Sequence, residues 1–147
     1  MPPIEMAVVR LRAMLSDGFR AAVERRDIEQ ARELFREDAA FRSPVLFKPY
    51  EGRDQVMRVL RAAEQVLGMG GTFRYVHQLE DADDRVAILE FATEVDGKLV
   101  EGIDKLTFDD DGLIVELKVM IRPLSALQAV GARMAEEFER LGLPLPQ

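Results

Sequence analysis

The sequence predicts an α+β domain in which one curved antiparallel sheet carries helices on one face. Two features of the chain support this prediction. Apolar residues recur at three- and four-residue spacing in the first half, which is typical of helices, whereas the second half mostly alternates apolar and polar residues, as strands do. Short turns rich in aspartate and glycine separate the alternating segments, which indicates hairpins between neighbouring strands.

The first half of the chain contains three predicted helices and one short strand. Asp27 is placed to cap the free amides of the second helix, with Gln30 three residues on, as in a capping box. Pro44 interrupts the strand because proline has no amide to donate to a sheet. The expected elements are a helix over 4–25, a short helix over 27–35, a strand over 39–45, a loop over 46–54 and a helix over 54–67.

The sequence of the second half of the chain predicts a four-stranded antiparallel meander followed by a last helix. That helix begins at Ser125, with Gln128 as the partner of its capping box, and it either covers the mouth of a cavity or crosses to a partner subunit. We expect one domain over 1–147, with its core at about 5–123. The expected strands cover 72–80, 85–95, 98–109 and 113–122, and the last helix covers about 125–141.

Asp104 is the one carboxylate on an otherwise apolar strand face. A two-residue turn at Asp96 and Gly97 places Asp104 opposite Leu89, and directly opposed residues share a face. Asp104 is therefore expected to point toward the helices. The same parity gives the inner face of the following strand Val115, Leu117, Val119 and Ile121, and gives its outer face Ile114, Glu116, Lys118, Met120 and Arg122.

The predicted face of His77, the only histidine, depends on the length of the loop in the first hairpin of the meander. A four-residue loop at 81–84 would turn its half of the strand away from the helices, and a five-residue loop or a bulge would correct this. We expect the correction, which brings His77 to the inner face beside Asp104. The residues concerned are Phe73, Tyr75, His77 and Leu79.

A buried carboxylate has two interpretations. Removing its charge from water costs several kcal/mol, so it raises its pKa or finds partners. In the first interpretation a tyrosine, a histidine or the backbone satisfies Asp104, which only fixes the core. In the second, sheet and helices leave an apolar pocket in which Asp104 is a proton donor or orienting group. The expected lining residues are Phe19, Phe41, Ser43, Phe73, Tyr75, Leu89, Phe91, Leu117 and Val119.

Three stretches, in this order and spacing, resemble a known family. They are "FRAAVERRDIEQARELFREDAAFRSPV" (19–45), "YEGRDQVMRVL" (50–60) and "VEGIDKLTFDDDGLIVELKVMIRP" (100–123). The chain is similar over roughly 5–123 to the SnoaL-like and ketosteroid-isomerase-like branches of the nuclear-transport-factor-2-like, or cystatin-like, superfamily. The resemblance implies a cone-shaped α+β domain whose N-terminal helices pack on the concave face of the sheet and enclose a ligand cavity.

The resemblance carries over to individual positions only in part. Ketosteroid isomerases have a tyrosine on the first helix, a general-base aspartate before a proline on the first strand, and a protonated aspartic acid on the third meander strand. Asp104 matches the acid, whereas Phe19 stands at the tyrosine position and Ser43 at the base position. A serine hydroxyl has no basicity near neutral pH, so steroid isomerisation by that mechanism is not expected.

Other branches imply other sites. SnoaL-type polyketide cyclases use an acid–base pair in the pocket, which Asp104 and His77 would supply as catalytic residues. Limonene-epoxide-hydrolase relatives use an arginine between two acids, but strand parity sends the candidates Arg122 and Glu101 to the outer face. The apolar residues among the charges of that outer face favour a homodimer, as relatives commonly form.

Composition limits the remaining choices. The net charge of −7 disfavours nucleic-acid binding, and no apolar run is long enough for a membrane span. No cysteine is present, and the N-terminus does not look like a secretory signal, so we expect a cytoplasmic protein without a metal or cofactor. Three functions stay open: binding of a small apolar molecule, cofactor-independent isomerase, cyclase or hydrolase chemistry on an apolar substrate, and a scaffold role.

Overall fold

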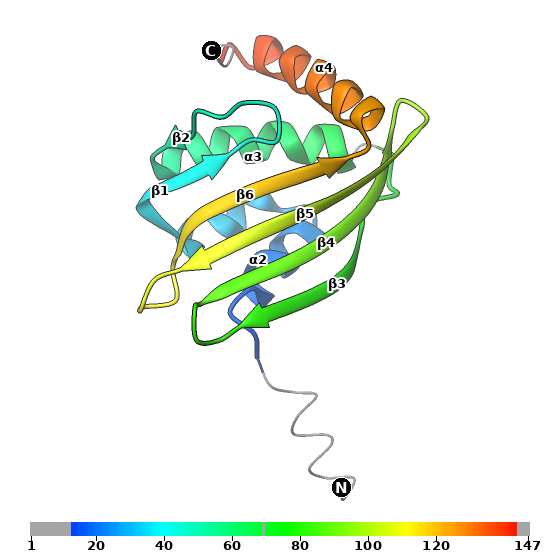
Figure 1. Ribbon diagram of the computed structural model, residues 1–147. Coiled ribbons are helices and arrows are strands. Elements are labelled where there is room, and N and C mark those ends of the chain that lie inside the picture. The colour runs from blue at the N-terminus through cyan, green and yellow to red at the C-terminus, as the bar shows by residue number, and fades with distance from the viewer. Residues whose placement is uncertain (1–12, 69, 144–147) are drawn as a thin grey trace, which may run out of the picture.

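The computed structural model describes residues 13–68 and 70–143 and confirms the α+β fold, with a curved six-stranded sheet and helices on one of its faces (Figure 1). The strands are β1 (Phe35–Arg42), β2 (Tyr50–Glu51), β3 (Arg74–Asp81), β4 (Val86–Val95), β5 (Lys98–Phe108) and β6 (Ile114–Arg122). The helices are α2 (Asp17–Glu24), the 3-10 helix η1 (Ile28–Leu34), α3 (Arg53–Gly68) and α4 (Leu124–Arg140). No helix in this part of the chain is long and apolar enough to cross a membrane.

The sheet is mixed, so the prediction of a wholly antiparallel sheet was wrong at one junction. Strands β3 to β6 form the predicted antiparallel meander, but β1 runs parallel to β6 in the strand order β2-β1-β6-β5-β4-β3. The parallel pair joins two segments that are far apart in the sequence, so no hairpin turn between them could indicate the pairing. β2 forms inside the predicted loop, where Tyr50 pairs with Phe41 and their rings make an edge contact at 6.3 Å.

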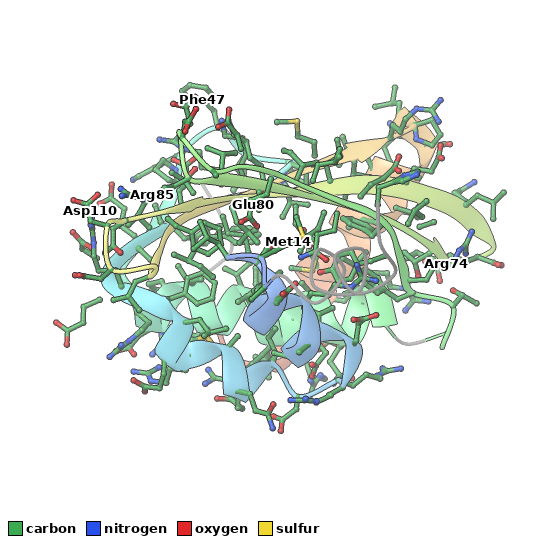
Figure 2. The ribbon with its side chains drawn as sticks, turned by 90° about the horizontal axis from the view of Figure 1, so that it is seen from below. Met14, Phe47, Arg74, Glu80, Arg85 and Asp110 are labelled. Carbon is green, nitrogen blue, oxygen red and sulfur yellow. The ribbon has the colours of Figure 1, made fainter. Side chains whose placement is uncertain are left out.

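The N-terminal helix is shorter than predicted within the described residues. α2 begins at Asp17, and residues 4–12 of the prediction lie outside the described part of the chain. A turn precedes the helix, in which the amide of Met14 donates to the Asp17 carboxylate at 2.8 Å. The amide of Leu15 donates to the carboxylate of Glu80 on β3 at 2.9 Å, which ties this turn to the sheet (Figure 2).

Neither predicted side-chain cap forms. The side chain of Asp27 makes no capping hydrogen bond; its backbone carbonyl instead accepts from the amide of Gln30, which gives a 3-10 turn in place of an α-helix. α4 starts one residue before Ser125, after Pro123, and it has no side-chain cap. The strand predicted at 39–45 begins at Phe35 instead and stops before Ser43 and Pro44.

A bulge in β3 overturns the predicted position of His77. Asp81 pairs with Val86, which leaves a four-residue loop, and the register then slips between Tyr75 and His77. The expected bulge therefore exists, but it restores only the residues that precede it. Tyr75 faces inward opposite Phe91, whereas His77 lies opposite Glu90 on the outer face.

A second irregularity places Ile114 on the face opposite to the predicted one. The β5–β6 register shifts between Thr107 and Phe108, so that Phe108 pairs with Ile114 and Val115 becomes the extra residue. Ile114 is buried instead of facing outward as predicted, and its neighbour on the other side is Phe35 of β1. From Glu116 onward the predicted parity holds, because Leu117 lies opposite Leu106.

The outer face of the sheet mixes apolar and charged side chains, as expected. Met120 is 47% exposed and Leu79 is 63% exposed, whereas Ile88, Ala92 and Ile103 are half-buried. Ion pairs join the outer edge of the meander, including Arg85 with Asp110 across its two turns at one end (Figure 2). A homodimer through this face stays a prediction.

A glycine on β5 lets an aromatic ring lie across the sheet. Gly102 pairs with Phe91, and a methyl group on Gly102 would stand 2.2 Å from the Phe91 ring and 2.8 Å from the Met120 carbonyl oxygen. The Phe91 ring stacks in turn on Phe73, with ring centroids 5.2 Å apart. Gly102 thus leaves room for the apolar Phe91 ring on the inner face, two residues along β5 from Asp104.

We predict that Gly102→Ala lowers the unfolding free energy by about 2 kcal/mol, because a backbone oxygen cannot move aside as a flexible side chain would. Chemical denaturation of both proteins measures the change. Gly131→Ala is the matched control: a methyl group on Gly131 of α4 would only touch Val45 at 3.6 Å, so this variant keeps or gains stability. Equal stability of wild type and Gly102→Ala would contradict the close packing.

Candidate functional site

A cavity of about 550 Å³ lies between the inner face of the sheet and the helices. Its walls come from α2, η1, α3 and α4, from the segment that follows β1, and from all six strands. Of the residues predicted to line it, eight do so: Phe19, Phe41, Ser43, Phe73, Tyr75, Phe91, Leu117 and Val119.

Leu89 does not line the cavity, contrary to the prediction. It lies on the inner face opposite Asp104, but neighbouring side chains of the core cover it completely, so none of its surface reaches the open space. Strand parity fixes the face of a residue but does not tell a filled part of the interior from a hollow one.

Helix α4 forms one wall of the cavity, which the sequence left open. It packs against α3, β5 and β6. Its side chains at four-residue spacing, Val130, Met134 and Phe138, face the space together with Gly131 and Ala135. The apolar stripe of this helix was visible in the sequence, but nothing there fixed the surface that it covers. Tyr50 and several apolar residues of α3 also line the cavity and were not predicted.

Asp104 lies on the inner face of β5, as strand parity predicts. It pairs with Leu89 on one side and Val119 on the other, and only 8% of its surface is exposed. The hydroxyl of Tyr75, two strands away, donates a hydrogen bond to Asp104 Oδ2 at 2.8 Å. No residue in the described part of the chain bonds to Oδ1, and Asp104 lines the cavity.

Burial in these apolar surroundings raises the pKa of Asp104 to about 7, and the hydrogen bond from Tyr75 opposes part of that rise. The pKa of Tyr75 is raised well above its ordinary value, first by burial and then by the negative charge of Asp104. Near neutral pH, Asp104 is therefore a carboxylic acid in a large fraction of molecules. In that form its free oxygen can donate a proton to a hydrogen-bond acceptor in the cavity.

The ring of Tyr75 also contacts Arg20 of α2. The Arg20 guanidinium carbon lies 5.7 Å from the centre of the Tyr75 ring, a cation–π contact. Arg20 also bonds to Glu24 at 3.0 Å and to Gln78 at 3.0 Å. The charged side chains of Arg20 and Glu24 on α2 and the neutral amide of Gln78 on β3 thereby orient the tyrosine that bonds to Asp104.

The other two positions suggested by the family resemblance carry no acid–base group. Phe19 is 2% exposed, and its ring packs edge-on against Phe35 with centroids 6.2 Å apart. The hydroxyl of Ser43 accepts hydrogen bonds from the amides of Val45 at 3.0 Å and Leu46 at 3.4 Å. Ser43 therefore shapes the turn after β1 at the cavity wall and does not supply a base.

His77 is separated from the cavity by the sheet. Its side chain is 68% exposed, and Nδ1 lies 2.7 Å from Glu90 Oε1 on the outer face. An acid–base pair of His77 and Asp104 is thus excluded, because the two side chains lie on opposite faces. The predicted outward position of Glu101 and Arg122 is confirmed, and these two residues form an exposed ion pair.

The described residues contain no cluster of three or more histidine, cysteine, aspartate or glutamate side chains that could hold a metal ion. The polar side chains that line the cavity lie at separate places in its wall. Asp104 and Tyr75 lie at the sheet, Ser43 and Tyr50 lie on the segment after β1 and on β2, and Glu24, Arg26 and Glu64 lie near the ends of α2 and α3.

Comparison with known proteins agrees with this geometry. Residues 17–117 match the model of the SnoaL-like domain family. A crystal structure of a steroid delta-isomerase from Pseudomonas aeruginosa is similar, with 38% sequence identity and a TM-score of 0.81, over 86% of this chain and 90% of that one. A cystatin-like protein from Silicibacter pomeroyi has 27% identity and a TM-score of 0.77, over 85% of each chain.

More distant structures share the fold. The epoxide hydrolase/cyclase-like enzyme SalBIII, which takes part in pyran ring formation in the polyether salinomycin, has 19% identity and a TM-score of 0.59, over 74% of this chain and 88% of that one. No curated protein sequence matches the chain significantly. The family match covers most of the described chain: α2, η1, β1, β2, α3 and the meander as far as Leu117, but not α4. The chain therefore belongs to the SnoaL-like domain family, within the superfamily of nuclear-transport-factor-2-like and ketosteroid-isomerase-like folds.

Proposed function

We propose that the protein binds a small, mostly apolar molecule in the internal cavity and holds one oxygen atom of that molecule with Asp104. One observation carries the proposal: a buried carboxyl group has a free oxygen at the wall of an apolar cavity. A group that only fixed the core would have both oxygens satisfied, because an unpaired buried polar atom is costly.

The size and lining of the cavity support a ligand of drug-like or smaller size. A volume of about 550 Å³ is in the range of small-molecule sites, which are mostly apolar with a few placed polar groups. Phenylalanine side chains of α2, β1, β4 and α4, and Phe73 just before β3, supply flat apolar surfaces. A polycyclic or aromatic skeleton is the shape that these surfaces fit best.

The protonation state of Asp104 selects the polar group of the ligand. With its pKa near 7, the carboxyl group donates a hydrogen bond at acidic and neutral pH and loses that proton in alkaline solution. A ketone or ester oxygen accepts this bond. A ligand without an oxygen would leave the carboxyl group unpaired in an apolar site.

Catalysis on an apolar substrate is the second candidate, and the similarity to a steroid delta-isomerase favours it. Tyr75 and protonated Asp104 are suited to stabilise a developing oxyanion. Such a reaction also needs a proton acceptor. The other carboxylates of the cavity, Glu24 and Glu64, are bonded to the Arg20 side chain and to the Ile28 amide. A β,γ-unsaturated ketosteroid tests this candidate: the absorbance of a conjugated enone, appearing faster than in buffer and lost in Asp104→Leu, would establish it.

The binding proposal predicts that 2-acetylnaphthalene raises the melting temperature more than 2-ethylnaphthalene does, because only the ketone accepts a hydrogen bond from Asp104. At about pH 6 we expect roughly tenfold tighter binding of the ketone, and at about pH 9 no preference. Calorimetric titration measures both affinities. Asp104→Leu should bind the two compounds equally. If neither compound binds at any pH, the proposed function is wrong.

The same pKa predicts the pH dependence of stability. The folded protein holds a proton on Asp104 up to about pH 7, whereas the unfolded chain releases it near pH 4. The unfolding free energy that Asp104 contributes therefore falls as pH rises from about 4 to 7, by at most about 1.4 kcal/mol per pH unit. Asp104→Asn cannot titrate, so its stability relative to wild type should rise over this interval in denaturation experiments. Parallel pH profiles of the two proteins would count against a buried neutral carboxyl group.

A further inference from the structure

The rim of the cavity carries a cation whose position the backbone fixes. The solvent-exposed residues among those that line the cavity mark its opening: Glu24, Arg26, Val45, Gly71 and Ala135. Arg26 is the only cation of the described chain that borders the cavity. It lies at the corner between α2 and η1, at the opposite end of α2 from the turn tied to Glu80.

The backbone at Arg26 is in the left-handed region, with φ of 55°, which residues other than glycine rarely adopt. This turn follows from the end of α2, where the Arg26 amide donates to the carbonyl of Val23 at 3.0 Å. The side chain then reaches the end of α3. A methyl group on Gly68 would stand only 3.0 Å from Arg26 Nη2 and 3.3 Å from Cζ, so the guanidinium lies close to that glycine.

The two glutamates that line the cavity already have partners. Glu24 bonds to Arg20 Nε at 3.0 Å, and Glu64 accepts from the amide of Ile28 at 3.1 Å. Among the residues that the structure describes, no acid forms an ion pair with Arg26. In contrast, neighbouring arginines of the same helical layer, such as Arg20 and Arg61, are paired. The rim therefore presents, beside an apolar cavity, a guanidinium group that pairs with no acid of residues 13–68 and 70–143.

We infer that the natural ligand is an apolar acid: its skeleton fills the cavity, a neutral oxygen meets Asp104, and a carboxylate meets Arg26 at the rim. A guanidinium binds a carboxylate through two parallel hydrogen bonds, which fixes orientation as well as affinity. This inference rests on the proposed function, since it adds a second polar contact to the same cavity. The chain has a net charge of −7, so an anion is attracted by this local group and not by the protein as a whole.

The test compares ω-(2-naphthoyl)alkanoic acids of increasing chain length with their methyl esters, which share the ketone but carry no charge. For at least one chain length we expect the acid to bind about tenfold more tightly than its ester at low salt, measured by calorimetric titration. Arg26→Gln should abolish this preference, so that acid and ester bind with equal affinity. Arg25→Gln is the matched control, because Arg25 is exposed next to Arg26 but does not line the cavity, and it should keep the preference.

A second variant separates the position of the guanidinium from its charge. Gly68→Ala keeps the charge but displaces the group, so it should also reduce the preference for the acid. If the esters bind and the acids bind no better at any length, the inference is overturned while the proposed function stands. The same holds if Arg26→Gln keeps the preference. If neither acids nor esters bind to the wild-type protein, the proposed function fails and the inference fails with it.

Discussion

Burial of the Asp104 carboxyl group among apolar side chains is the constraint on which the site depends. A charged carboxylate in such a place costs several kcal/mol, and one hydrogen bond from Tyr75 at 2.8 Å does not offset that cost. Burial therefore raises the pKa of the carboxyl group to about 7, so the group holds a proton at lower pH. A residue that would be an ordinary surface anion thus becomes a hydrogen-bond donor at the wall of a cavity, and its burial gives the site both polarity and pH dependence.

The surroundings of Asp104 depend on how residues on other parts of the fold pack. Gly102 has no side chain, so Phe91 lies across β5 and stacks on Phe73, whose ring in turn packs edge-on against Tyr75. Helix α4 closes the side that the meander leaves open. The cavity remains because rigid aromatic rings and the α4 wall hold the layers apart, while the centre of the core around Leu89 is filled. Specificity would then rest on few polar groups at fixed places.

The sequence was sufficient to predict the α+β fold class and the face on which Asp104 lies, but it did not predict the face of His77. A two-residue turn at Asp96 and Gly97 sets the pairing of β4 and β5 along their length, so one local signal fixes the face of Asp104. A bulge carries no such signal. It was expected somewhere in β3, yet its location between Tyr75 and His77 decides which of the two faces the cavity. The parallel β1–β6 pair and the α4 wall depend on contacts between distant segments, which periodicity does not encode.

The protonation of Asp104 is the central claim, and a carbon-detected NMR titration of its side-chain carboxyl group tests it most directly. Asp104→Asn assigns the resonance, and Tyr75→Phe checks the sign of the coupling, because loss of the hydrogen bond to the charged form should raise the pKa further. The account predicts a midpoint at about 7 in the folded protein without ligand. A midpoint near the ordinary value of about 4 would mean that water reaches the carboxylate, and it would contradict the account.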